Sequence, residues 1–344
     1  MLKSISLQHF RNYKKSSFEF DKSVIIIGPN TSGKSNLIES IYLLSTGKSF
    51  RAEKDSQMVT FGNEMGRVEA KTSEFELEVL VTVGEVAGVR TQFKRYFVNG
   101  VAKRRAEYVG NMPAVLFSPQ DLEIIVGSPG LRREFFDNVL EQTDRDYRIA
   151  LLGFQKALRQ RNALLELIKN GYKRSDREFE YWDSLVIRNG QVLTRKREEF
   201  VNYLNESKKD ILQVRIEYDK SEISKERLEQ YYSQERSSGV TLVGPHRDDF
   251  FVFINKDRQL KSFGSRGQQR LGVLQLKLLE LNYVKNHAEN EPILLLDDVF
   301  SELDEDHIIL ILGIRNNQQT IITTTHEEFL PSKIKSTMKV IELK

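Results

Sequence analysis

The pattern of apolar and polar positions divides the chain into three parts. Up to about residue 125, short alternating segments predict mostly strands, for example over 2–10 and 75–81. Residues 90–98, followed by Asn99-Gly100, have the signature of a hairpin with a tight turn. The apolar run 24–27 predicts a strand, and residues 36–44 behind it predict a helix.

The middle part is highly charged and carries apolar residues at helical spacing. One apolar stripe runs from Phe136 to Ile168, and a second begins at Trp182. Gly171-Tyr172-Lys173 lies between the two stripes as a turn. We therefore predict an antiparallel arm of two main helices, followed by a strand over 210–218 and a helix over 225–234.

From Thr241 onward the strand pattern returns and alternates with helices. The predicted strands are 250–254, the run before Asp297 and 320–324, and the predicted helices are 267–285 and 306–315. Such alternation is typical of a parallel sheet with crossover connections. The sequence thus predicts an α/β fold in which residues 1–130 and 240–344 form one head and residues 131–239 form an inserted helical arm.

Composition narrows the class of protein. The 344 residues suffice for two domains, and the lack of cysteine excludes disulfides and thiolate metal sites. The 52 basic and 49 acidic residues nearly balance, so any contact with nucleic acid must come from a local patch. No apolar run approaches the ~18 residues of a membrane span, and no signal peptide begins the chain. We predict a cytoplasmic protein.

A phosphate-binding loop joins the first predicted strand and helix. The segment Gly28-Pro29-Asn30-Thr31-Ser32-Gly33-Lys34-Ser35 matches the pattern G-x-x-x-x-G-K-[ST]. Backbone N–H groups and the helix N-terminus would face the phosphates there, so the context argues against a chance match. Lys34 is expected to contact the β- and γ-phosphates of ATP, and Ser35 to ligate Mg²⁺.

Two acids end an apolar run far downstream of this loop. Asp297 closes the run Ile293-Leu294-Leu295-Leu296, where a carboxylate facing Mg²⁺ belongs, and Asp298 is placed to orient the attacking water. The alternative is that these residues cap the following helix. Because Asp is one methylene shorter than Glu, we expect slow hydrolysis.

A third segment, Ser265-Arg266-Gly267-Gln268, precedes the helix predicted at 267–285. Taken alone, it is equally compatible with a helix start capped by Ser265. It gains weight as a nucleotide-binding segment because it lies about 30 residues ahead of the acid pair in a chain with a phosphate-binding loop.

Together these segments resemble the ABC-type ATPases of the SMC class and, more closely, the RecF family of bacterial recombination mediators. Further segments match that family in the same order along nearly the whole chain, apart from the arm. They are Phe10-Arg11-Asn12-Tyr13, Ser49-Phe50-Arg51, Gly127-Ser128-Pro129 with Arg132-Arg133, and Gly244-Pro245-His246-Arg247-Asp248-Asp249. One departure is Thr31, where the family usually has Gly or Ala; a Thr whose side chain points outward should be tolerated.

The resemblance implies that ATP is sandwiched between two copies of the chain in a symmetric homodimer. Lys34 and Ser35 of one copy would face Ser265, Gly267 and Gln268 of the other, and loss of the γ-phosphate would loosen the dimer.

The resemblance also implies several further site residues. They are Gln120 near Mg²⁺ and the attacking water, Asp304 reaching across the dimer, His326 as sensor of the γ-phosphate, and Arg11 and Asn12 near the nucleotide. The open alternatives are a polar loop residue for Gln120, a helix cap for Asp304 and a surface residue for His326.

A basic segment without acids lies on the predicted hairpin. Its members are Arg90, Lys94, Arg95, Lys103, Arg104 and Arg105, with Phe93, Tyr96 and Phe97 interleaved. Basic groups attract phosphates and aromatic rings can stack on bases, so this hairpin is a candidate DNA-binding element. The alternative is an edge strand protected by charge. A second basic segment, 156–177, could bind DNA or a protein, or form only a solvated helix face.

The sequence therefore predicts an ATP-dependent DNA-binding protein of recombinational repair and replication restart, with ATP and Mg²⁺ as cofactors and slow, DNA-stimulated hydrolysis. The resemblance further implies binding to single-strand gaps, duplexes and junctions, cooperation with RecR and RecO, loading of RecA and support of the SOS response. The alternative is an ABC- or SMC-like ATPase associated with transport or with a nuclease. The helical insertion and the arginine-rich hairpin count against transport, and a nuclease would require an additional acidic domain.

Overall fold

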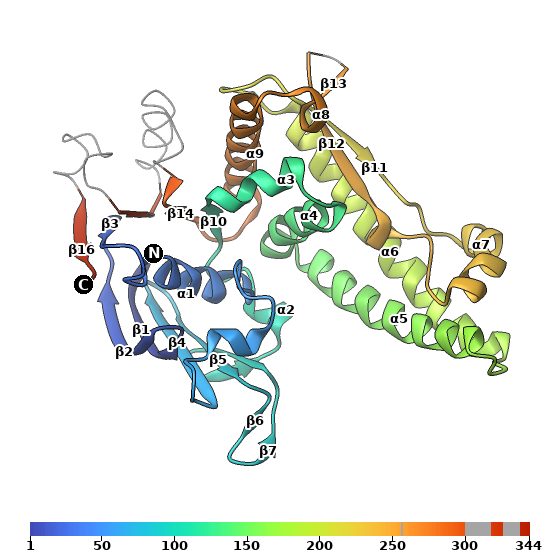
Figure 1. Cartoon of the computed structure of the whole chain (residues 1–344), viewed down its shortest axis with the longest axis horizontal. Coiled ribbons are helices and arrows are strands. Elements are labelled where there is room, and N and C mark those ends of the chain that lie inside the picture. The colour runs from blue at the N-terminus through green and yellow to red at the C-terminus, as the bar shows by residue number, and fades with distance from the viewer. Residues whose placement is uncertain (256, 300–317, 326–337) are drawn as a thin grey trace. The chain divides into compact units, whose positions relative to one another are not determined.

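The computed structural model describes residues 1–255, 257–299, 318–325 and 338–344, and the chain forms two compact units (Figure 1). The first unit contains residues 1–120 and 284–344, and the second contains residues 121–283. Residues 121–130 and 240–283, which we expected in the head, thus fold together with the helices of the expected arm. Their assignment to the ATPase head stays a prediction, and the helix predicted at 306–315 lies outside the described residues.

An antiparallel sheet makes up much of the first unit, with the strand order β2-β1-β4-β5-β8-β9. Its strands are β1 (Leu2–Phe10), β2 (Tyr13–Glu19), β4 (Met65–Thr72), β5 (Glu76–Thr82), β8 (Lys94–Val98) and β9 (Val101–Lys103). Asn99 and Gly100 join β8 to β9 with φ values of 50° and 74°, as a type I′ turn requires, which confirms the predicted hairpin. The strand predicted over 90–98 is interrupted. Its main part, β8, begins only at Lys94, and residues 91–93 separate it from the short β7 (Val89–Arg90).

A second sheet in this unit is parallel, as predicted, with the strand order β10-β14-β15-β3-β16. Its strands are β3 (Ser23–Ile27), β10 (Ala114–Phe117), β14 (Ile293–Asp297), β15 (Thr320–Thr324) and β16 (Lys339–Glu342). All five residues of β14 and of β15 are buried, as in a sheet covered on both faces. Because the strands are parallel, their carboxyl ends meet at one edge of the sheet.

The helix α1 (Lys34–Thr46) contacts strands of both sheets in the first unit. Leu37, Ile38 and Ile41 are fully buried, and most other residues of the helix are buried as well. A helix covered on all sides needs apolar residues all round rather than a single stripe. The central core of the unit therefore fixes the helix that starts at the phosphate-binding loop.

The second unit contains the long helices α5 (Arg145–Lys169) and α6 (Asp176–Glu206), which pack against each other as predicted. The stripe predicted from Phe136 to Ile168 is not one helix, because α4 (Pro129–Thr143) ends within it and α5 begins only at Arg145. Asp144 separates the two helices and caps α5, since its carboxylate accepts a hydrogen bond of 2.9 Å from the backbone N–H of Tyr147.

The rest of the second unit consists of shorter elements. They are α3 (Glu123–Val126), β11 (Arg215–Asp219), α7 (Lys225–Ser238), β12 (Asp249–Ile254), β13 (Arg258–Gln259), α8 (Leu260–Phe263) and α9 (Arg266–His287). The strand predicted over 210–218 begins only at Arg215, whereas α7, β12 and α9 lie close to their predicted ranges. Strand β12 pairs with β11 and with β13 in an antiparallel sheet, so the prediction that 250–254 contributes to the parallel sheet is wrong.

Residues 244–249, whose role the sequence leaves open, bind α4 and α6 through buried ion pairs. Asp249 accepts two hydrogen bonds from Arg132 of α4, with N–O distances of 2.5 Å and 2.9 Å. Asp248 binds Arg197 of α6 at 2.9 Å, and the same guanidinium donates to the carbonyl of Pro245 at 2.7 Å. These contacts tie α4 to the first residue of β12 and α6 to the residues just before that strand.

Candidate nucleotide-binding site

The phosphate-binding loop, residues 28–33 between β3 and α1, follows a tight path that requires glycine. Gly33 has a φ of 104°, and a Cβ atom there would lie 2.8 Å from both the Asn12 Nδ2 and the Tyr13 hydroxyl. Thr31 also lies in the left-handed region, with a φ of 74°, and its side chain is exposed. A β-branched residue is strained at this φ, so Thr31 carries a backbone cost in the loop.

Lys34 is held inside the curve of this loop. Its ammonium group donates hydrogen bonds to the carbonyls of Gly28 at 2.7 Å and Pro29 at 2.9 Å. Burial lowers the pKa of Lys34, and the nearby carboxylates of Asp298 and Asp297 oppose that shift. The cation and the acid pair therefore belong to one site, although they come from opposite ends of the chain.

Ser35 and Asp297 form an oxygen pair suited to a small hard cation. The Ser35 hydroxyl donates to the Asp297 carboxylate at 3.1 Å, and the Thr323 hydroxyl donates to the same oxygen at 2.7 Å. Burial is the main cause that raises the pKa of Asp297. Among the residues that the structure describes, no cluster of three His, Asp or Glu side chains forms a complete metal cage. A hydroxyl and one carboxylate fit Mg²⁺, which keeps several water or phosphate ligands of its own.

Asp298 has a left-handed backbone with a φ of 53°, which is uncommon for a residue other than glycine. Its N–H donates to the Thr323 hydroxyl at 3.1 Å, so β15 fixes the peptide that presents its carboxylate. Asp and Asn tolerate this conformation better than larger residues do. Such an outlier beside Lys34 supports a functional role for Asp298.

Gln120 follows β10 in the short 3₁₀ turn Pro119–Leu122, and its side chain is exposed. Because β10 pairs in parallel with β14, its carboxyl end lies next to the end of β14 that carries Asp297. Gln120 therefore comes directly after the edge of the sheet that carries Asp297, as its predicted role near Mg²⁺ requires. Asp304 and His326, predicted for the same site, lie outside the described residues.

Arg11 and Asn12 take different positions around α1. Arg11 makes two hydrogen bonds, of 2.6 Å and 2.8 Å, to the fully buried carboxylate of Glu39 in the middle of the helix. Asn12 covers Gly33 and accepts a hydrogen bond of 2.8 Å from Asn36. Asn12 thus contacts the phosphate-binding loop itself, whereas Arg11 holds α1, the helix that follows the loop.

Arg51 is a residue of this site that our sequence reasoning did not assign. Its guanidinium donates to the Asn36 side chain at 2.9 Å, and its positive charge lowers the pKa of Asp297. The available signal was the match of Ser49-Phe50-Arg51 to the RecF family, to which we attached no role.

The segment Ser265-Arg266-Gly267-Gln268, called the signature segment from here on, spans the start of α9 in the second unit. The Ser265 hydroxyl accepts from the backbone N–H of Gln268 at 3.2 Å, and the Gln268 side chain accepts from the N–H of Ser265 at 3.0 Å. This reciprocal cap is the structural alternative that the sequence allowed. Ser265 and Gly267 are exposed, so within a single chain the helix N-terminus is also open to a ligand.

The six basic residues of the hairpin segment separate into two groups. Lys94 donates to the carbonyl of Gly47 at 2.9 Å and pairs with Asp55 at 2.7 Å, and burial lowers its pKa. Arg105 donates to the carbonyl of Thr46 at 2.7 Å, so both side chains bind the carboxyl end of α1. The exposed members are Arg90, Arg95, Lys103 and Arg104.

The parallel sheet, the phosphate-binding loop and the acid pair at one edge define an ATPase of the ABC type. The family model described as RecF/RecN/SMC N terminal domain matches residues 1–343. The chain is 34% identical to the DNA replication and repair protein RecF of Bacillus mycoides over 98% of this chain and 96% of that protein. For RecF of Clostridium tetani the identity is 34%, over 99% and 97% of the two chains. The chain belongs to the RecF family.

Solved structures agree with this assignment. The recombination mediator protein RecF with ATP, described as part of the RecFOR pathway, superimposes with a TM-score of 0.86 at 34% identity, over 96% of this chain and 93% of that chain. The Smc head domain of Pyrococcus furiosus gives a TM-score of 0.51 at 17% identity, over 100% of this chain and 94% of that chain, which shows a shared fold alone.

Within the described residues, no helix is both long and apolar enough to cross a membrane.

Proposed function

We propose that this protein is an ATP-dependent DNA-binding protein of recombinational repair, which closes as a homodimer when ATP is bound. The observation that carries the proposal is that one chain holds two different half-sites. One is the phosphate-binding loop with Lys34, Ser35 and Asp297, and the other is the exposed start of α9 at Ser265 and Gly267. Relatives named as DNA replication and repair proteins, and a solved RecF with ATP, support it.

Each side chain of the site has a task in this proposal. Lys34 exchanges its loop carbonyls for β- and γ-phosphate oxygens, which are charged acceptors and therefore stronger partners. Ser35 and Asp297 would hold Mg²⁺, which supplies positive charge against the phosphates. Asp298 and Gln120 orient the attacking water, with Asp304 and His326 assigned to the same reaction. Slow hydrolysis then acts as a timer that releases the dimer.

The partner copy contributes the N–H groups at the start of α9 and the Ser265 hydroxyl. These donors favour the γ-phosphate because they add to the positive end of the helix. The contact exists only while the γ-phosphate is present, so ATP favours the closed dimer by differential binding.

The exposed basic side chains of the hairpin supply the DNA contact in this proposal. Arg90, Arg95, Lys103 and Arg104 are positioned to neutralise phosphates, and Arg95 lies over the Phe97 ring at 5.4 Å. The family further supports action at single-strand gaps and junctions, cooperation with RecR and RecO, loading of RecA and a role in the SOS response.

Sedimentation with ATP and gapped DNA tests the dimer. Wild type is expected to dimerise, whereas Lys34→Met and Ser265→Arg are expected to remain monomeric because each removes one half of the nucleotide enclosure. Ser262→Arg is a matched control, since Ser262 is also exposed and lies just before the signature segment. Dimerisation of either site variant at the wild-type ATP concentration, or a wild type that stays monomeric, would refute the proposal.

A further inference from the structure

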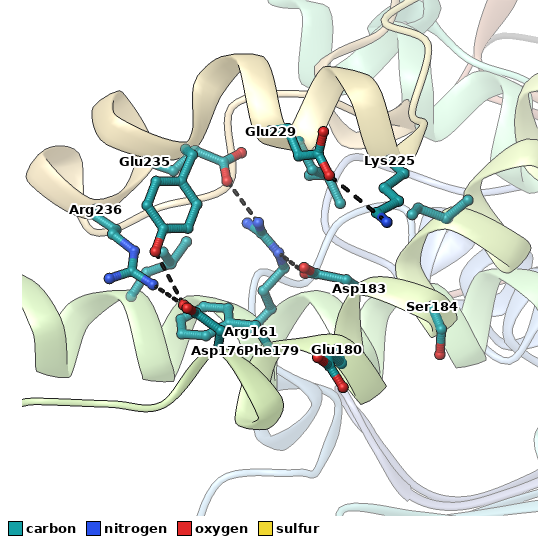
Figure 2. Close-up of a pocket in the computed structure, with 14 residues that line it drawn as sticks. Arg161, Asp176, Phe179, Glu180, Asp183, Ser184, Lys225, Glu229, Glu235 and Arg236 are labelled. Carbon is teal, nitrogen blue, oxygen red and sulfur yellow. Dashed lines mark hydrogen bonds and ion pairs between the residues drawn. The ribbon is translucent and has the colours of Figure 1, made fainter.

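The second unit contains a pocket whose residues take no part in the proposed nucleotide site (Figure 2). Helices α5, α6 and α7 surround a volume of about 310 Å³. Its apolar wall consists of Leu165, Phe179, Ile187 and Leu228, and three of these side chains are buried. This volume lies at the lower end of the range of ligand pockets, which begins near about 300 Å³.

At the buried end of the pocket, one guanidinium faces two carboxylates. Arg161 pairs with Asp183 at 2.6 Å and with Glu235 at 2.7 Å, and Figure 2 shows both contacts as dashed lines. Glu235 is only 1% exposed, and its Oε2 makes the ion pair without a well-directed hydrogen bond. The other oxygen of Glu235 accepts a hydrogen bond of 2.8 Å from the N–H of Leu242. Two carboxylates facing one guanidinium still leave negative charge at this end, so the pocket favours a further cation.

The rim of the pocket adds more negative charge. Arg236 pairs with Asp176 at 2.7 Å, and Lys225 lies 3.9 Å from Glu229. Glu180, on the α6 side, has no ion-pair partner among the residues that the structure describes. The lining therefore holds five carboxylates against three basic groups: Asp176, Glu180, Asp183, Glu229 and Glu235 against Arg161, Lys225 and Arg236.

We propose that this pocket binds an arginine or lysine side chain from an exposed basic segment of another protein. The aliphatic stem would lie on Phe179, Ile187 and Leu228, with the cationic group toward Glu180 and Glu229. The excess of carboxylates repels the phosphates of nucleic acid, which argues for a protein as the occupant.

The surroundings of the pocket also fit a protein interface. Tyr232 on its wall is 46% exposed, and Tyr181 of α6, next to Glu180, is 61% exposed. Tyrosine is enriched where proteins meet, because it offers a large rigid surface with one polar atom.

The proposal is tested by calorimetric titration of the full chain with the acetylated and amidated peptide Gly-Leu-Arg-Arg-Leu-Gly. The wild type should bind this peptide and should not bind the matched peptide Gly-Leu-Glu-Glu-Leu-Gly. The double variant Glu180→Gln/Glu229→Gln should weaken binding by about tenfold, because it removes two charges from the rim and leaves the shape of the pocket intact. Ser184→Arg should abolish binding, since an exposed position on the pocket wall then supplies its own cation.

Glu206→Gln is the matched control, because Glu206 lies at the end of the same helix and outside the pocket. This variant should bind the arginine peptide as wild type does. Thermal melting of each variant identifies loss of folding as a separate cause. Equal binding of the two peptides, wild-type affinity in the Glu180/Glu229 double variant, or displacement of the arginine peptide by a DNA duplex would overturn the proposal.

Discussion

A glycine with a positive φ can be required for its backbone conformation alone, or also because a side chain would not fit. Gly33 and Gly62 are examples of the two cases. Gly33 has a φ of 104° and touches Asn12 and Tyr13 so closely that no Cβ atom fits. Gly62 has a φ of 81°, but no atom of the described residues lies within 4 Å of the place that a Cβ would occupy. Of these two positions, only Gly33 is one where a larger residue has to displace its neighbours.

Gly33→Ala is expected to weaken ATP binding by at least about tenfold, because the new methyl group pushes Asn12 and Tyr13 away from the loop and distorts the cradle. Gly62→Ala should cost only the backbone strain of roughly 1–2 kcal/mol in unfolding free energy and leave nucleotide affinity unchanged. Titration with a fluorescent ATP analogue and urea unfolding of both variants measure the two effects. Equal nucleotide affinities in the two variants would contradict the steric account.

His246 is expected to make the second unit sensitive to acid. Its Nε2 lies 3.1 Å from the Thr241 carbonyl and must donate, whereas Nδ1 is buried without a hydrogen-bond partner in the described part of the chain. Burial lowers the pKa of His246 to about 4. An unfolded histidine titrates near about 6.5, so between those values the unfolded state binds a proton that the folded state does not.

Stability should therefore fall as the pH drops from about 6.5 to 4, with a total loss of up to about 3 kcal/mol from this group. His246→Gln can keep a donor to Thr241 and does not titrate, so its stability should depend less on pH over that window. Urea unfolding at several pH values between about 4.5 and 7 measures the difference. Parallel pH profiles for wild type and variant would show that another group is responsible.

At the scale of elements, the hairpin of β8 and β9 supports α1 as well as presenting charge. Lys94 and Tyr96 of β8 donate to the carbonyl of Gly47, which caps α1, and Arg105, just after β9, donates to the carbonyl of Thr46. Cations at this end complement the helix dipole and satisfy carbonyls that have no partner within the helix. The basic residues of one short segment thus divide into supports for α1 and exposed charges.

Lys94→Met is expected to lower the unfolding free energy by about 1–3 kcal/mol, because it leaves the Asp55 carboxylate and the Gly47 carbonyl without this donor.

The triple variant Arg95→Glu, Lys103→Glu and Arg104→Glu should keep wild-type stability and lose DNA retention. Its plot of log affinity against log salt should be flatter by about 0.9 for each DNA phosphate that the variant no longer neutralises. Thermal melting and DNA binding at several salt concentrations check both parts, and unchanged DNA binding in the triple variant would assign the hairpin to support alone.

For the whole molecule, the proposed dimer places two half-sites from each chain into two composite ATP sites. A mixture of variants can test this arrangement in a way that single variants cannot. A Lys34→Met chain still has an intact signature segment, and a Ser265→Arg chain still has an intact phosphate-binding loop. Their heterodimer therefore holds one complete site and one site with both defects.

Mixing equal amounts of the two variants is expected to restore ATP-dependent dimers and up to about half of wild-type turnover, since neither variant dimerises alone and each heterodimer holds one intact site of two. Either variant alone should show neither property. Sedimentation and phosphate release of the mixture provide the measurements. A mixture that behaves as the sum of its inactive parts would argue for a site built within one chain.

Sequence patterns alone predicted much of the local structure. The phosphate-binding loop, its strand and helix, the Asn99-Gly100 turn, the pairing of α5 with α6 and the parallel sheet all follow from residues close together in the chain. Periodicity and turn chemistry act over a few residues, so they are visible without the fold. The site residues predicted this way, Lys34, Ser35 and Asp297, belong to motifs whose spacing reflects backbone geometry.

Tertiary structure decided what depends on contacts between distant segments. Only the fold shows that Lys94 and Arg105 bind α1, that Arg51 acts on Asp297, and that residues 244–249 pair with Arg132 and Arg197. Whether a basic side chain is exposed or buried depends on carbonyls and carboxylates that other parts of the chain bring to it. No local pattern encodes those partners, because a side chain's environment is set by packing rather than by its neighbours in sequence.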